Sequence, residues 1–143
     1  MGKKIVVLVL AISALLVSSC RKSGCTDLDA TNYSASAKQS DGSCTYSESL
    51  IFWQDQATAQ SWAGFATTLY YYVDGQLVGS SAANVYFSGT PSCSQNGLTS
   101  TEIDMGKNKS KSVNVKVIDD TGFEWWNEFI SVTAGSCNYY QVF

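Results

Sequence analysis

Five cysteines are the most reactive side chains of this 143-residue sequence, which contains no histidine. Without histidine the chain cannot build a Ser-His-Asp site, a Cys-His site or a histidine-ligated metal centre. No phosphate-binding loop, dinucleotide fingerprint or G-x-S-x-G elbow occurs. The adjacent carboxylates Asp119 and Asp120 shortly precede Gly122, which indicates a turn and not a glycosidase pair. The sequence therefore predicts neither an enzymatic activity nor a cofactor.

The first twenty residues have the anatomy of an export signal. Two lysines precede an apolar run over residues 5–17, which is shorter than the roughly 20 residues that a membrane-spanning helix needs. The run ends in Val17-Ser18-Ser19-Cys20, which resembles the lipobox of bacterial lipoproteins. That resemblance implies that residues 1–19 are a signal peptide, that Cys20 receives a diacylglycerol, and that the mature protein starts there. The alternative is an ordinary secreted protein with a coincidental cysteine after its signal.

An acylated Cys20 would tie the protein to a membrane of the bacterial cell envelope, for which we expect the outer membrane. Two or three acyl chains hold a protein durably, whereas one chain binds only marginally. Once the signal and its two lysines are removed, the chain has seven basic and twelve acidic residues. Because this net charge is negative, nucleic acid is not an expected partner. We predict that the basic cluster of Lys107, Lys109, Lys111 and Lys116 forms a solvated loop that runs into an edge strand.

The four cysteines that follow Cys20 predict two disulfides, because an even number of cysteines in an exported chain is typical of a disulfide framework. Three pairings are possible. Cys25 and Cys44 lie in a short polar segment, whereas Cys93 and Cys137 lie in the strand-rich remainder, so we predict the two sequence-local pairs. No C-x-x-C spacing is present, and we expect no zinc.

The segment from Gly24 to Tyr46 has almost no branched aliphatic residues and cannot form a core of its own. Its outline resembles a cysteine-bounded module of exported proteins of Gram-negative bacteria, which implies no particular activity. The residues on that outline are Gly24, Cys25, Asp27, Ala30, Asn32, Tyr33, Ala37, Asp41, Gly42, Ser43, Cys44 and Tyr46. We interpret residues 20–47 as a lipid-anchored tether with a disulfide hook.

The hook also contains oxygen-bearing side chains that could bind calcium. Calcium takes six to eight oxygen ligands in proteins. The candidates do not have the spacing of an EF-hand and lack a bidentate glutamate, so a purely structural hook is the preferred interpretation. These candidates are Asp27, Asp29, Asn32 and Asp41.

Residues 48–143 alternate short runs of β-branched and aromatic residues with turn-forming residues, and none of them has helical periodicity. This pattern predicts an all-β fold, an immunoglobulin-like antiparallel sandwich of about seven strands preceded by the small disulfide-closed module. Asp74-Gly75 between two apolar runs predicts a two-residue hairpin turn. The expected strands are 50–54, 66–73, 76–81, 98–103, 111–118, 124–133 and 138–143.

Alternation along the strands predicts which side chains are buried. Val113, Val115 and Val117 should face the core, with Lys116 facing water. In the next strand the same parity places Trp126 over the core and Trp125 outside. Glu128 would then point inward, which indicates a bulge or a local twist.

The strand-rich part also resembles the small immunoglobulin-like or PEGA-like sandwich domains of bacterial lipoproteins. The motifs that carry this resemblance include Tyr72-Val73-Asp74-Gly75-Gln76 and the run that ends at Cys137. Glu128 and the insertion-like loop 55–62 depart from the family pattern. The resemblance implies a binding or spacer module without a catalytic role.

Aromatic side chains are the remaining candidates for ligand contact. Tyr70, Tyr71 and Tyr72 cannot all be buried in one strand, because successive residues face opposite sides. Exposed rings could stack on sugars or enter a partner's pocket, although cross-strand aromatic pairing would explain them without a ligand. The candidate contacts are Trp53, Trp62, Tyr70, Tyr72 and Trp125.

These features together predict a membrane-anchored envelope lipoprotein. Its expected role is that of a non-catalytic binding or display module that contacts a protein or a glycan through exposed aromatic side chains. Two alternatives stay open: a structural spacer without a ligand, and a calcium-dependent adhesive module that uses the hook.

Overall fold

The computed structural model describes residues 21–143. The predicted signal peptide of residues 1–19 and the predicted lipidation site Cys20 lie outside the described residues. Across residues 21–143 the structure contains no helix with the length and hydropathy of a membrane span.

Seven strands form two sheets that pack as a sandwich. The smaller sheet has the order β6-β3-β9 and the larger one the order β5-β4-β7-β8. The predicted seven-stranded, all-β sandwich is therefore confirmed. The strands are β3 (Tyr46–Gln54), β4 (Thr68–Val73), β5 (Gln76–Ala82), β6 (Thr99–Gly106), β7 (Ser110–Asp119), β8 (Glu124–Thr133) and β9 (Asn138–Val142).

All neighbouring strands of the sandwich are antiparallel except β3 and β9, which run parallel. The chain crosses from one sheet to the other between β8 and β9, so that β9 lies beside β3 instead of beside its predecessor in sequence. The first strand starts at Tyr46, slightly before the boundary expected at residue 48. The expectation of an edge strand after the lysine cluster is wrong, because β7 lies between β4 and β8.

The core lies between the sheets and follows the predicted alternation. Val113, Val115 and Val117 are completely buried, as expected. From the opposite sheet, the ring of Phe52 stacks on that of Tyr71 with centroids 4.6 Å apart. Apolar burial of this kind is the main stabilising term of a small sandwich.

Local backbone features confirm the predicted hairpin turn, whereas the bulge of the β7–β8 pair lies away from its predicted position. Asp74 and Gly75 both have positive φ, 49° and 79°, as a two-residue hairpin turn of this type requires. In the β7–β8 pair, Val117 opposes Trp126 and Ile118 opposes Glu124, so Trp125 is the extra residue of a bulge. The irregularity expected near Glu128 thus occurs at Trp125.

One short helix, α2 (Gln56–Ser61), occupies the loop expected at residues 55–62. No helical periodicity marks this segment in the sequence, and the short helix does not change the all-β class of the fold. Asp55 caps the helix, because its side chain accepts a 2.8 Å hydrogen bond from the backbone N–H of Thr58. A helix of six residues is too short to produce a periodic sequence pattern, so its cap residue is the available signal.

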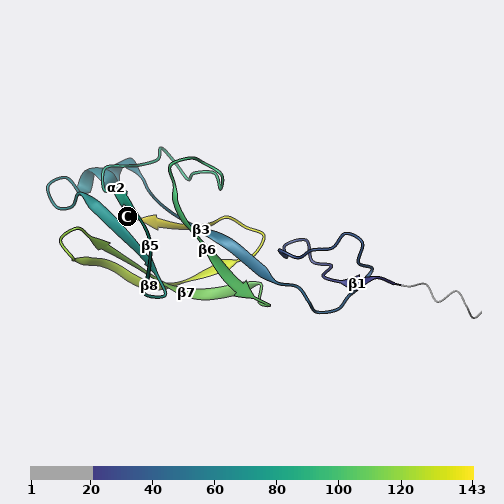
Figure 1. Cartoon of the computed structure of the whole chain (residues 1–143). Helices are drawn as coiled ribbons and strands as arrows, with labels where there is room; N and C mark the ends of the chain where they lie inside the picture. The colour runs from purple at the N-terminus through teal and green to yellow at the C-terminus, as the bar shows by residue number, and fades with distance from the viewer. Residues whose placement is uncertain (1–20) are drawn as a thin grey trace, which may run out of the picture.

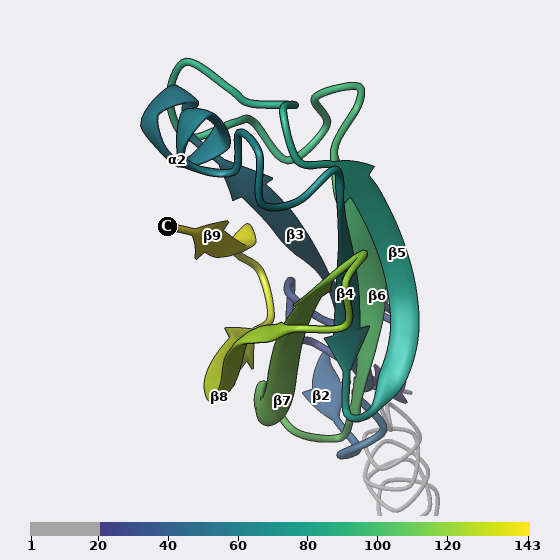
Figure 2. The same ribbon diagram turned by 90° about the vertical axis from the view of Figure 1, so that its left-hand side faces the viewer.

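The disulfide hook precedes the sandwich and projects from one end of it (Figure 1). Its short strands β1 (Ser23–Gly24) and β2 (Gln39–Ser40) pair in parallel. Helix α2 and the C-terminus lie at the other end of the sandwich (Figure 1), which is the end that faces the viewer in Figure 2. Residues near α2 and near the C-terminus are therefore held away from the hook.

Candidate binding site

An aromatic pocket lies at the end of the sandwich that is distant from the hook. Its volume is about 230 Å³. The residues come from three places: the end of α2 and the loop after it, the first part of β8, and the C-terminus. They are Ser61, Trp62, Phe65, Trp125, Trp126 and Phe143.

The rings around this pocket meet at steep angles. Trp62 lies 4.7 Å from Trp125 with an interplanar angle of 84°, and 5.8 Å from Trp126 with an angle of 78°. Phe123 contacts Trp125 from the other side, at 4.9 Å and 67°. Edge-to-face packing of this kind is favourable because the positive edge of one ring meets the negative face of the next. The cluster therefore has a defined shape.

A buried glutamine holds Trp62 in place. Gln54, the last residue of β3, accepts a 2.8 Å hydrogen bond from the indole N–H of Trp62. Its amide nitrogen donates to the carbonyl oxygens of Ala83 and Val85, both at 2.7 Å. Gln54 thus connects the indole to the loop that follows β5.

A buried carboxylate holds Trp125. Asp119 is 4 % exposed and accepts a 2.8 Å hydrogen bond from the indole N–H of Trp125. The Thr121 hydroxyl and the Trp125 indole, together with two backbone N–H groups, lower the pKa of Asp119 to about 2, although burial acts in the opposite direction. Asp119 is therefore ionised at neutral pH. No lysine or arginine of residues 21–143 forms a salt bridge with it.

A second depression of about 240 Å³ continues the first one. It shares Phe65 and Trp125 with the pocket and is further lined by Asp119, Thr121 and Phe123. Phe65 is 70 % exposed and Phe143 is 76 % exposed. The rings around the two depressions therefore adjoin one another, and we call them the aromatic cluster: Phe65, Phe123, Trp125 and Phe143 are exposed, Trp126 is half-buried and Trp62 is buried.

The aromatic residues singled out from the sequence differ in their positions. Trp53 and Trp62 were expected to be exposed, and this is wrong, because they are 7 % and 4 % exposed. Trp53 lines a small cavity together with Phe87 of the loop after β5. The backbone N–H of Phe87 donates a hydrogen bond to the carbonyl oxygen of Gln54, which holds this loop beside β3. Trp62 nevertheless lines the aromatic pocket, as does Trp125.

Tyr70 and Tyr72 lie elsewhere, half-buried on β4. In the register of the larger sheet, Tyr72 opposes Lys116, whose ammonium nitrogen lies 5.2 Å from the centroid of the Tyr72 ring. Trp126 is half-buried and packs against the core, as predicted, while Trp125 is partly exposed. Of the five predicted contacts, only Trp62 and Trp125 belong to the aromatic cluster.

Strand parity could not identify the phenylalanines of the cluster, because they lie in loops or at the chain end. Phe65 and Phe123 each follow a glycine, Gly64 and Gly122, with a positive φ. An isolated phenylalanine directly after a turn glycine was the available signal. No such signal marks Phe143.

Asp119 and Asp120 act in turns, as the sequence indicated. Asp119 accepts hydrogen bonds from the backbone N–H groups of Thr121 and Phe123. Asp120 accepts from the backbone N–H and the hydroxyl of Thr67. Both carboxylates thus fix the start of β4 and the β7–β8 turn beside the aromatic cluster.

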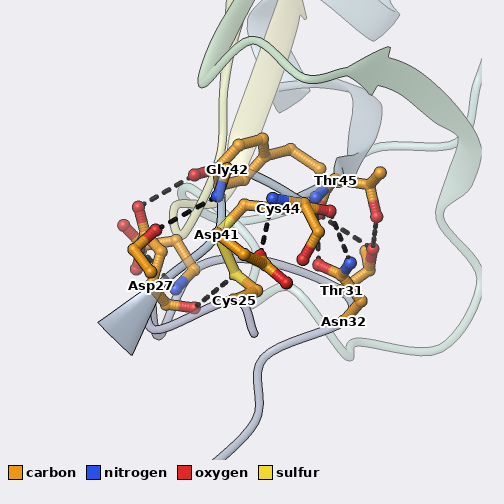
Figure 3. Close-up of a disulfide and its surroundings, with 12 residues drawn as sticks. Cys25, Asp27, Thr31, Asn32, Asp41, Gly42, Cys44 and Thr45 are labelled. Carbon is orange, nitrogen blue, oxygen red and sulfur yellow. Dashed lines mark hydrogen bonds between the residues drawn. A yellow bond between two sulfur atoms is a disulfide. The ribbon is translucent and has the colours of Figure 1, made fainter. Parts of the chain in front are cut away.

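The hook is closed by the predicted disulfide between Cys25 and Cys44 (Figure 3). The side chain of Asn32 donates to the carbonyl of Ser43 at 2.7 Å and accepts from the N–H of Thr45 at 3.0 Å. Asp41 accepts from the N–H of Ser43. The two Asn32 bonds connect the halves of the hook, and the Asp41 bond fixes the local turn before Cys44.

The hook is also joined to the sandwich. Lys109 lies 2.7 Å from a carboxylate oxygen of Asp27 and 2.9 Å from one of Asp29. These contacts raise the pKa of Lys109. The hydrogen bond that Asp27 accepts from Lys109 is the largest cause of the lowered pKa of Asp27. Tyr46 donates a further 2.9 Å hydrogen bond to Asp27.

The four calcium candidates of the hook are thus engaged in other contacts: Asp27 and Asp29 with a lysine, and Asn32 and Asp41 with the backbone. Within residues 21–143, no group of three or more Asp, Glu, Cys or His side chains is placed to hold a metal ion. The geometry therefore does not favour the calcium alternative over a structural hook.

The second predicted disulfide, Cys93–Cys137, ties the long loop between β5 and β6 to the start of β9. Tyr139 reinforces this connection, since its hydroxyl donates a 2.7 Å hydrogen bond to the carbonyl oxygen of Pro91. The loop is thereby fixed to the strand that ends at the aromatic cluster.

No family model, curated protein or solved structure matches this chain. The resemblances to lipoprotein signals, to the cysteine-bounded module and to PEGA-like domains therefore rest on the sequence motifs alone. Function has to be inferred from the geometry of the site.

Proposed function

We propose that this protein is a lipid-anchored, non-catalytic binding module of the bacterial cell envelope, which contacts a protein or glycan partner through the aromatic cluster. The observation that carries this proposal is the continuity of exposed rings across two adjoining depressions. Scattered exposed apolar residues are ordinary on a protein surface, whereas a contiguous patch is typical of an interaction site. A spacer without a ligand has no need for such a surface.

The position of the cluster agrees with a display role. The chain enters the sandwich from the hook at one end, and α2 and the C-terminus lie at the other (Figure 1). An anchor at Cys20 would precede the hook directly in sequence. The aromatic cluster would then lie at the end of the molecule that is turned away from the membrane.

Binding through the cluster is tested with Phe65→Ser combined with Phe143→Ser. Both side chains are largely exposed, so we expect the fold to survive while capture of envelope proteins or glycans by the mature chain falls about tenfold or more. Phe129→Ser is the matched control, because Phe129 is 73 % exposed but does not line either depression. Equal capture by wild type and double variant would exclude the cluster as the contact surface.

Anchoring is tested with Cys20→Ala. We expect the wild-type protein to sediment with membranes and to require detergent for release, whereas the variant moves to the soluble fraction, because the thiol that would carry the lipid is gone. The double variant Cys25→Ala/Cys44→Ala should keep its membrane association. A Cys20→Ala protein that still requires detergent would contradict the lipid anchor.

A further inference from the structure

We propose that the aromatic pocket binds a quaternary ammonium group, namely a trimethylammonium group carried by the partner. This inference rests on the proposed function, because it names the chemical group that enters the site proposed there. Four features of the pocket lead to this class of ligand: its rings, its scarcity of hydrogen-bonding groups, a nearby carboxylate without a cationic partner among residues 21–143, and its size.

The first feature is the composition of the walls. Three tryptophans and two phenylalanines line the pocket, and Trp62 stands nearly perpendicular to both Trp125 and Trp126. A group in the pocket therefore contacts aromatic rings from several directions. Such enclosures bind methylated ammonium groups, because the cation is attracted to the negative faces of the rings, and tryptophan is the strongest of them.

The second feature is the scarcity of hydrogen-bonding groups. Ser61 contributes the only side-chain oxygen of the lining, and its hydroxyl already donates to the carbonyl of Thr58 at 2.7 Å. The indole N–H groups of Trp62 and Trp125 are engaged with Gln54 and Asp119.

This scarcity separates the ligand classes. A primary ammonium has three N–H donors and a guanidinium has five, and both need several acceptors, whereas Ser61 Oγ is the single side-chain acceptor of the pocket lining. A sugar has several hydroxyl groups with the same requirement. A trimethylammonium group has no donor to satisfy, so its entry leaves no hydrogen bond unmade.

The third feature is negative charge without a cation. The ionised carboxylate of Asp119 is buried, and within residues 21–143 its partners are N–H and O–H groups only. It accepts from the indole of Trp125, which lines both depressions. A negative charge bonded to the indole N–H increases the electron density of that ring and therefore its attraction for a cation.

The fourth feature is size. A volume of about 230 Å³ lies below the roughly 300–1,000 Å³ of pockets that enclose a whole drug-sized ligand. The pocket thus suits a single compact group at the end of a larger partner. Its opening to solvent through the exposed Phe65 and Phe143 leaves room for the rest of that partner.

The test compares choline with 3,3-dimethyl-1-butanol, which has the same shape but a neutral carbon in place of the charged nitrogen. The mature chain with Cys20→Ala is titrated with each, while the indole N–H signals are followed by NMR. We expect choline to shift the signals of Trp125 and Trp126 and to bind about tenfold or more tightly than the neutral isostere. Equal affinities, or no response to choline, would overturn the inference.

A second measurement uses Phe65→Leu, which keeps an apolar side chain but removes one ring. This variant should lose most of the preference for choline and retain the weak binding of the isostere, whereas Phe129→Leu should behave as wild type. An unchanged preference in Phe65→Leu would contradict a role of the ring face.

Two further ligands identify the source of the group. Stronger binding of a trimethyl-lysine peptide than of its unmethylated counterpart would point to a protein partner, and stronger binding of phosphocholine to a decorated glycan or lipid headgroup. These experiments distinguish a failure of this inference from a failure of the proposed function. If choline has no effect but Phe65→Ser/Phe143→Ser still abolishes partner capture, the cluster binds a partner by another chemistry.

Discussion

Replacing both Cys93 and Cys137 with serine should lower the free energy of unfolding by about 4 kcal/mol. The bridge spans a sequence separation of 44 residues, and in the chain-entropy model a loop of that length restricts the unfolded chain by roughly this amount. Such a loss is comparable to the whole stability of many small domains. Urea unfolding of the mature chain, followed by tryptophan fluorescence, measures it.

The hook supplies the matched comparison. Cys25→Ser/Cys44→Ser opens a loop with a sequence separation of 19, for which the same model gives about 3 kcal/mol. This change should destabilise the hook more than the sandwich, since the disulfide of the sandwich is still present. A Cys93→Ser/Cys137→Ser protein that unfolds at the same urea concentration as wild type would contradict the role assigned to the bridge.

The strands could be predicted because their cause is local. Alternating valines at residues 113–117 specify one buried face whatever the rest of the fold does, and Asp74-Gly75 specifies its turn by the φ angles it tolerates. The pairing of β3 with β9 had no such local cause. Its parallel direction depends on the crossing between sheets after β8, which no residue pattern encodes.

The predicted contact residues failed for a related reason. Strand parity distinguishes the two faces of a sheet, but it does not show which loop covers an outward face. Trp53 lines a small cavity together with Val85 and Phe87 of the loop after β5, and this ring, expected in solvent, is buried. The aromatic cluster, by contrast, is assembled from Trp62, Trp125 and loop phenylalanines that are distant in sequence, and only the fold brings them together.

The hook illustrates a third limit. Its composition correctly indicates that it cannot form a core alone, but Cys25 and Ala30 are buried in one cluster with the sandwich residues. Lys109, expected in solvent, pairs with Asp27 and Asp29 across this junction. A pairing between residues some eighty positions apart requires the three-dimensional structure.

Gln54→Leu should destabilise the protein by about 3–5 kcal/mol and abolish ligand binding at the aromatic pocket. Leucine has nearly the same size but no polar atoms. The change therefore leaves two buried groups without a partner, the indole N–H of Trp62 and the carbonyl oxygen of Ala83, and it also removes the part-buried bond to the carbonyl of Val85. Each unsatisfied buried group costs about 1–3 kcal/mol, and neighbouring losses are not fully additive.

The effect on binding follows from the same contacts. Gln54 is 2 % exposed at the end of β3 and fixes Trp62, which in turn packs at right angles against Trp125. Without this hydrogen bond, the Trp62 indole loses the polar contact that fixes its orientation, and we expect the perpendicular arrangement of the pocket walls to be disturbed. Gln141→Leu is the control, since Gln141 lies on the neighbouring strand β9, opposite Trp53, and is only half-buried. Urea unfolding and choline titration of both variants measure the two effects. If Gln54→Leu unfolds and binds like Gln141→Leu, the buried glutamine does not hold the site together.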